Sequence, residues 1–264
     1  MLQSIPPQLR YFLAAALLLA ACGSDVQAAT LAIRYRTGDQ ETYHVHQVFT
    51  AALASAGAQI QPLTFDLRAV ERTKVTAVAG DGTATLEVQL LDTTGTSNGQ
   101  PLPPLGTQSY QLLVGPDGRI LGGGASAAGT SAVSVPSADQ SFAILPDRKV
   151  KPGDAWTRDY ERPNPLGSGS LKVHSENRFL RYEQLNGVQA AVVESRLSTP
   201  VDQQVTLAGQ PLQETGTVTA DVTSWVDAGT GRFLKTTSAA KFQLSAAGYQ
   251  LQGSQTLEVD RASP

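Results

Sequence analysis

The sequence of 264 residues has a single cysteine, Cys22, so no disulfide bond can form within the chain. Its Lys and Arg residues are spread along the whole chain and its formal net charge is −3, so no basic stripe is present to neutralise a nucleic-acid backbone. Aromatic residues make up only 6% of the chain, so the core must come mainly from Val, Leu, Ala and Thr. The longest apolar run is much shorter than the roughly 20 residues of a membrane-spanning helix. These absences argue against a disulfide scaffold, a nucleic-acid-binding protein and a helical membrane protein.

The N-terminus has the pattern of a secretory signal peptide. Arg10 precedes an unbroken apolar run, Tyr11–Ala21, and small residues follow it. The stretch Leu19-Ala20-Ala21-Cys22 resembles the lipobox of bacterial lipoproteins, in which an aliphatic residue and two small residues precede a cysteine. The resemblance implies that the chain is cut before Cys22 and that the Cys22 thiol carries a diacylglyceryl group bearing fatty acids such as palmitate.

The lipobox predicts where the protein is held. Residues 1–21 would be a lipoprotein signal peptide, and residues 22–30 the lipidated cysteine and a polar tether. Stable anchoring needs more than one acyl chain, and lipoproteins carry several. We therefore expect an extracytoplasmic protein of the cell envelope, anchored through Cys22 to a membrane, which is the outer membrane where the bacterium has one. The alternative is an ordinary secretory signal that is cut near residues 26–28, so that Cys22 is discarded.

Residues 31–264 have the pattern of one all-β domain. In the stretch 65–78, for example, Phe65, Leu67 and Ala69 fall on one face of a strand. The other face carries Asp66, Arg68 and Val70. Comparable strand patterns cover residues 42–49, 83–91, 110–121, 170–182, 189–198, 215–226, 232–244 and 249–260. We expect about ten to twelve strands and almost no helix, in an antiparallel, strongly curved sheet or an open or half β-barrel.

The middle of the chain differs from the rest. Residues 122–149 are predicted to be a connector, because the stretch 122–134 is rich in Gly, Ala and Ser without a clear period. Ser137 is predicted to cap a single helical turn through Phe142. The flanking segments 31–121 and 150–260 can be interpreted as two similar halves, since Val114–Leu121 matches Val226–Leu234 apart from one inserted residue. The alternative is that β-hairpins simply resemble one another.

The most specific stretch of the mature chain is LPDRKVKPGDAW, residues 145–156. Together with Tyr35-Arg36-Thr37-Gly38-Asp39…Tyr43 and the later Gly229-Thr230-Gly231-Arg232, it resembles a family of uncharacterised bacterial lipoproteins and secreted proteins. The shared motifs are structural, and the resemblance implies no activity. Physically, Pro152-Gly153 favours a turn in which Asp154 can accept backbone N–H groups, and Trp156 is expected to pack in the core. A ligand-facing role for Trp156 is the alternative.

Signals for catalysis are weak. His44 and His46 would share one face of a strand. His174 would be a third metal ligand if the two halves packed together, as in a metal-dependent hydrolase. The alternative is three polar side chains on solvated strand faces. No Gly-x-Ser-x-Gly elbow is present, and no Gly-Lys-Ser/Thr follows the glycines at 122–124. We therefore expect no enzymatic activity, no catalytic residue, no metal and no cofactor.

Two functions remain open from the sequence. The first is a non-enzymatic envelope lipoprotein whose concave sheet binds a lipid or another apolar small molecule. Its lining would come from the strands over residues 45–49, 75–90, 192–197 and 218–225. Trp225, the last residue of the fourth range, would then face the ligand, and residues 122–135 would cover it. The second is a structural or protein-interaction module of the envelope with a closed, packed core. The first rests on fold analogy with lipoprotein carriers.

Overall fold

A computed structural model describes residues 28–55, 58–59, 62–124, 142–163, 170–207 and 210–262. These residues form an all-β protein without helix. Nothing among them is a helix of the length and apolarity that crossing a membrane requires. Cys22 and the rest of the predicted signal peptide and lipobox lie outside the described residues, and so does Ser137 with its predicted helical turn.

The first half of the chain contributes the strands β1 (Ala29–Thr30), β2 (Gln40–Ser55), β3 (Ala58–Gln59), β4 (Leu63–Val78), β5 (Ala84–Ser97), β6 (Gln100–Pro101), β7 (Gln108–Val114) and β8 (Ile120–Gly124). The second half contributes β9 (Lys149–Val150), β10 (Ala155–Pro163), β11 (Ser170–Leu185), β12 (Val188–Leu207), β13 (Gln210–Asp227), β14 (Phe233–Ala246) and β15 (Tyr249–Arg261).

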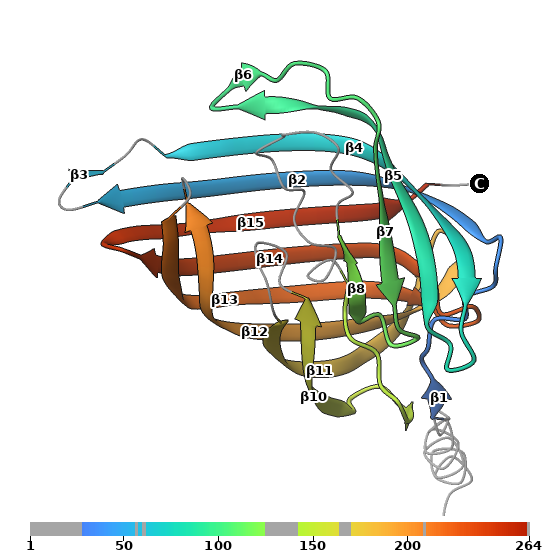
Figure 1. The fold of residues 1–264 in the computed structure, drawn as a ribbon. Coiled ribbons are helices and arrows are strands. Elements are labelled where there is room, and N and C mark those ends of the chain that lie inside the picture. The colour runs from blue at the N-terminus through green and yellow to red at the C-terminus, as the bar shows by residue number, and fades with distance from the viewer. Residues whose placement is uncertain are drawn as a thin grey trace, which may run out of the picture.

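Eleven of these strands form one continuous antiparallel path, β10-β11-β12-β13-β14-β15-β2-β4-β5-β7-β8. The C-terminal strand β15 pairs with β2, which joins the two halves of the chain side by side (Figure 1). The end strands β8 and β10 contact each other without hydrogen-bonding as neighbours, so the sheet is a nearly closed barrel. The predicted antiparallel, strongly curved sheet is therefore confirmed.

Successive residues of the strands face the concave and the convex side of the sheet in turn. On β4, Phe65, Leu67 and Ala69 face the concave side, in register with inward residues of β2, as predicted. Glycines allow the sheet to curl. A Cβ on Gly253 would lie 2.1 Å from the carbonyl oxygen of Thr50 and 2.4 Å from the ring of Phe242, so only glycine fits where these strands bend.

A short segment, residues 143–145, runs through the barrel and donates backbone hydrogen bonds to buried serines. The backbone N–H of Ala143 donates to Ser224 Oγ at 2.9 Å, and that of Ile144 donates to Ser195 Oγ at 2.9 Å. Leu145 donates its N–H to the carbonyl of Asp117 at 2.9 Å. Because this segment lies outside the sheet ladder, its N–H groups need such partners, and the inward serines supply them.

The main core surrounds this segment. Leu31 and Ile33 from the N-terminal side pack with Ile144, Leu145 and Phe179, and all five are almost completely buried. We call residues 31–39 the strap, because they cross one end of the barrel before β2 begins. At the opposite end, which we call the distal end, β2 finishes and β4 starts (Figure 1).

The turn Pro152-Gly153 leads into β10, as predicted. Asp154 accepts the backbone N–H of Lys151 at 3.0 Å, and Gly153 and Asp154 exchange hydrogen bonds with the backbone of Phe179. Gly153 has a φ of +96°, which glycine adopts without strain. The turn therefore fixes the start of β10 against β11.

Several boundaries differ from the sequence prediction. Residues 122–124 belong to β8, so the predicted loop begins too early. The strand predicted to end at Ser198 continues to Leu207, because beyond Ser198 β12 has only β13 as a neighbour, and Pro200 is tolerated in such an edge environment. The single-domain division and the two similar halves stay predictions.

Candidate functional site

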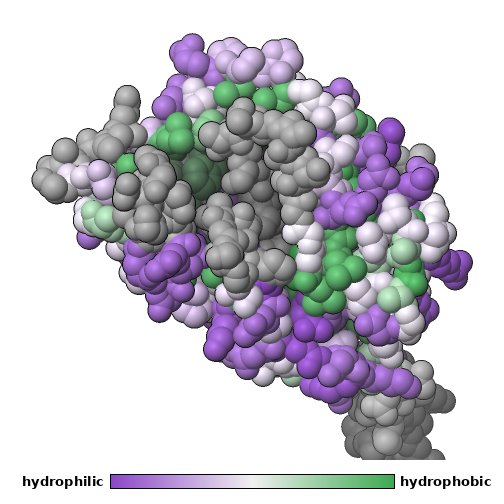
Figure 2. All heavy atoms as spheres, in the orientation of Figure 1, coloured by the Kyte–Doolittle hydropathy of each residue, from purple (hydrophilic) through white to green (hydrophobic). Residues whose placement is uncertain are grey.

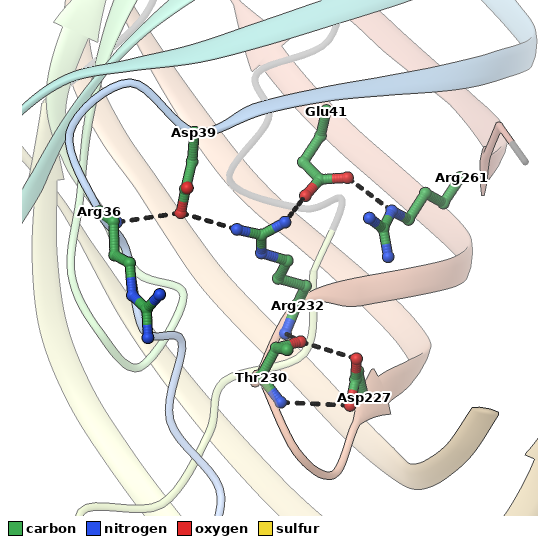
Figure 3. Close-up of polar contacts among 7 residues, drawn as sticks. All are labelled: Arg36, Asp39, Glu41, Asp227, Thr230, Arg232 and Arg261. Atoms are coloured by element: carbon green, nitrogen blue, oxygen red, sulfur yellow. Dashed lines mark hydrogen bonds and ion pairs between the residues drawn. The ribbon is translucent and has the colours of Figure 1, made fainter. Parts of the chain in front are cut away.

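Two of the motifs singled out in the sequence meet at the strap end of the barrel. Arg232, after the turn between β13 and β14, forms an ion pair with Asp39 of the strap at 2.7 Å and a second pair with Glu41 at the start of β2. Arg261, at the end of β15, approaches the other oxygen of Glu41 at 2.5 Å (Figure 3). Segments from the beginning, the later part and the end of the chain are therefore joined by one network of charges.

The turn that carries Arg232 is ordered by its own side chains. Asp227 accepts the backbone N–H of Gly229 at 2.7 Å. It also accepts the hydroxyl of Thr230 at 2.7 Å (Figure 3). Gly231 follows with a φ of +76°, and a Cβ there would lie 1.8 Å from the carbonyl oxygen of Ala32. Glycine is therefore required for the turn to touch the strap.

The strap is held from both sides by its backbone. Ile33 donates its N–H to the carbonyl of Pro116 at 2.8 Å, in the turn between β7 and β8. Gly38 donates to Val75 at 2.9 Å, and Val75 donates back to Asp39 at 2.9 Å. These bonds place Asp39 and Glu41 beside Arg232.

A cavity of about 70 Å³ lies under this network. Its polar lining includes Asp39, Glu41, Glu71 and Arg232. Its apolar walls come from β4, β5, β7 and β8 together with the segment around Phe142, and they include Val75, Leu86, Val88, Leu112, Val114, Ile120, Phe142 and Phe233. By volume it has room for about two water molecules. It is far too small for an acyl chain.

Glu71 is the unusual member of the lining. It belongs to the inward face of β4, directly opposite Tyr43 on β2 and Leu90 on β5. No hydrogen bond or ion pair joins its carboxylate to another residue in the described part of the chain. Burial raises the pKa of Glu71 to about 7, so this carboxyl group gains and loses its proton near neutral pH.

Three tyrosines surround the same region. Burial, with help from the charge of Asp117, raises the pKa of Tyr35. Burial likewise raises the pKa of Tyr43 and Tyr110, and in both the charge of Glu71 adds to the effect. The three phenols are therefore neutral at physiological pH and bring no charge to the cavity.

The histidines lie elsewhere. His44 and His46 point to the outer face of β2, where they line a shallow groove with Arg68, Glu258 and Asp260. His46 Nε2 lies 3.0 Å from Asp66. His174 is on β11, which four strands separate from β2 in the sheet, and its Nδ1 lies 2.7 Å from Asp159. The structure does not bring the three together, and the described residues contain no group of three His, Cys, Asp or Glu side chains placed to hold a metal.

The two tryptophans have different surroundings. Trp156 of β10 packs against the main core, and its Nε1 donates to the carbonyl of Ile144 at 3.2 Å. Trp225 of β13 lies on the outer face, since its neighbour Ser224 points inward, and its Nε1 donates to the carboxylate of Glu183. Trp156 thus contacts the interior segment, and Trp225 does not face the concave side.

Aromatic rings line the concave side at the distal end. Phe49 stacks on Phe242, with ring centroids 5.5 Å apart, and lies 6.4 Å from Phe65. All three side chains are only partly buried. Figure 2 shows apolar residues at the base of a hollow over the distal ends of β2 and β4, in the upper left of the view.

The sequence motifs indicated Asp39, Tyr43 and Arg232 but not Glu41, Glu71 or Arg261. Glu71 has a signal in the sequence, because it continues the inward phase of Phe65, Leu67 and Ala69, where a charge is unexpected. Arg261 has no such signal, because its role depends on β15 lying beside β2.

No family model and no curated protein matches the chain. Among solved structures, the chain is similar to the crystal structure of the hypothetical lipoprotein YmcC from Escherichia coli (K12), with a TM-score of 0.24 and 16% sequence identity. The match covers 96% of this chain and 98% of that chain. A TM-score of this size carries no argument, so no property of that protein is assigned to this one. The family resemblance of the motif at residues 145–156 stays a prediction.

Proposed function

We propose that this protein is a non-enzymatic lipoprotein of the cell envelope, anchored through Cys22, whose concave sheet binds the acyl chain of a lipid at the distal end. One observation carries the binding proposal: Phe49, Phe65 and Phe242 face the concave side at that end and are only partly buried. Partly exposed, stacked aromatic rings in a concavity are the kind of lining that apolar ligands use. The main core fills the other part of the barrel.

The anchoring part of the proposal rests on the sequence stretch Leu19-Ala20-Ala21-Cys22. Its test is the variant Cys22→Ala expressed as the full chain. We expect the wild-type protein in the membrane fraction with incorporated radioactive palmitate, and the variant without label. Equal labelling of the two proteins would overturn the lipidation of Cys22.

The binding part is tested by native mass spectrometry on residues 24–264, exported to a bacterial periplasm without lipidation. We expect adducts of lipid mass that are lost when the protein is denatured. Phe49→Gln should abolish the adducts because it places a polar amide among the rings. Val48→Gln is the matched control, since Val48 is the next residue on the same strand and faces outward. A clean apo mass for the wild type, with nothing recovered by solvent extraction, would overturn lipid binding.

A second candidate function is an interaction module of the envelope with a packed interior. The observation that favours it is the size of the cavity under the strap, about 70 Å³, which admits no acyl chain. The end strands β8 and β10 would then offer their unpaired edges to a partner. A clean apo mass would favour this candidate.

A further inference from the structure

The cavity under the strap combines apolar walls with a carboxylate that has no cationic partner. Asp39 and Glu41 are both neutralised, because Arg232 pairs with each of them and Arg261 pairs with Glu41. Glu71 lines the same cavity and has no ion pair or hydrogen bond with any described residue. The Glu71 side chain is partly buried, and an ionised carboxylate between apolar walls is costly unless a cation meets it.

The charged and titratable groups that face Glu71 come from every element around the cavity. Tyr43 lies opposite it on β2, Tyr110 approaches from β7, and Tyr35 approaches from the strap. All three phenols are neutral at physiological pH, because burial raises their pKa values. Of the arginines that line the cavity, Arg232 is engaged by two carboxylates, and Arg34 donates to the carbonyl of Gly229 at 3.3 Å. When Glu71 is ionised, its carboxylate is the one in this lining that has no ion-pair partner among the described residues.

The walls indicate which cation fits. Val75, Leu86, Val88 and Val114 line the same cavity as the carboxylate and give it apolar walls. The carboxylates of the lining are not placed as a metal site, since the described residues contain no group of three His, Cys, Asp or Glu side chains that could hold a metal ion. An alkylammonium has the complementary pattern, with a charged N–H donor at one end and an apolar group at the other. The neutral aromatic rings nearby also attract an ammonium group. A cavity of about 70 Å³ limits the ligand to a few non-hydrogen atoms.

We propose that this cavity is a binding site for a small primary alkylammonium, whose nitrogen pairs with the carboxylate of Glu71 and whose alkyl group contacts the apolar walls. The site is separate from the aromatic rings at the distal end and does not depend on lipid binding there. A ligand of so few atoms has limited binding energy, so its dissociation constant should be in the millimolar range.

The test uses the purified full chain and ethylammonium chloride as the probe. At pH 8 we expect ethylammonium to raise the Tm in a saturable way, with a half-effect at millimolar concentration. Potassium chloride and tetramethylammonium chloride at the same concentrations should not do so, because the first lacks an alkyl group and the second lacks an N–H donor. At pH 6 the half-effect concentration should be about tenfold higher, because the ligand then competes with a proton on Glu71.

Glu71→Gln should abolish the response while the protein stays folded, since it removes only the charge. Glu87→Gln is the matched control on the neighbouring strand β5, where the side chain faces outward. A saturable response retained in Glu71→Gln would overturn the proposal. So would the absence of a response in the wild type, or an equal response to potassium chloride, which would indicate a general salt effect.

Discussion

Arg232 and Glu41 form an ion pair across the mouth of the cavity although they are 191 positions apart in the chain. Glu41 lies at the start of β2, and Arg232 at the end of the turn before β14, so the pair ties the N-terminal strap to the second half of the sheet (Figure 3). Both side chains are largely buried: 26% of the Arg232 side chain is exposed and 12% of the Glu41 side chain. The pair is therefore protected from solvent screening to a degree that surface pairs are not.

The first prediction concerns this pair. Arg232→Met should lower the free energy of unfolding by about 2–3 kcal/mol, because it leaves Asp39 without a counter-charge and Glu41 with one fewer. The matched control is Arg196→Met, whose pair with Asp221 leaves 73% of each side chain exposed and should have little effect on stability. Urea unfolding followed by tryptophan fluorescence measures both. Equal costs for the two variants would contradict a role for burial.

The second prediction concerns the pH dependence of stability. The pKa of Glu71 is about 7 in the folded protein, above its ordinary value of 4.5 in an unfolded chain. The folded state thus keeps this proton when the unfolded state has lost it, so stability falls as pH rises from about 4.5 to about 7 and is unaffected by this group above that. Glu71→Gln should remove this decline and be more stable than the wild type by about 2–3 kcal/mol at pH 8.

Urea unfolding of wild type and Glu71→Gln at pH 5 and pH 8, without added amine, checks the second prediction. Glu87→Gln serves as the outward-facing control and should follow the wild type at both pH values. Parallel stability curves for wild type and Glu71→Gln would show that Glu71 does not titrate in this range.

The third prediction concerns the contact of Gly231 with the strap. Gly231→Ala should cost at least about 3 kcal/mol, because the new Cβ would overlap the carbonyl of Ala32 in addition to straining a positive φ. Gly248→Ala isolates the strain alone, since Gly248 has a φ of +83° but no atom within 4 Å of a Cβ, and should cost about 1 kcal/mol. Hydrogen exchange should show faster exchange at Ile33 and Arg34 in Gly231→Ala only. Equal effects of the two variants would contradict a specific role for the contact.

The fourth prediction concerns the segment inside the barrel. Ser195→Ala should cost about 1–3 kcal/mol, because it leaves the buried N–H of Ile144 without an acceptor. Ser198→Ala on the same strand faces outward and should change stability by less than about 0.5 kcal/mol. The Tm of each variant, measured by calorimetry, distinguishes them. A neutral Ser195→Ala would show that another group satisfies Ile144.

Much of the sheet could be predicted from local pattern. The alternation in β4 identified its inward residues, and the Pro152-Gly153 turn was predicted from turn chemistry. The strand β10 and the second half of β12 were not predicted. Pro163 is the last residue of β10, and Pro200 interrupts the pattern of β12. Such prolines are compatible with a strand only where a neighbour is missing, and the sequence does not display neighbours.

The candidate site was predicted only in part. Asp39 and Arg232 belong to motifs, but nothing in the sequence says that they touch, because their pairing requires the turn after β13 to reach the strap. The same holds for His174. Local pattern allowed it to lie near His44 and His46, but the strand order places four strands between β11 and β2.

The sequence by itself determined the all-β class, the inward and outward faces of the strands and the turns, because each depends on neighbours along the chain. Only the tertiary structure decided that β15 lies beside β2, that the strap crosses one end of the barrel, and that Glu71 faces a cavity in which no described cation pairs with it. The physical reason is that burial and charge pairing depend on which distant segments meet, and long-range strand order is not encoded in any local period.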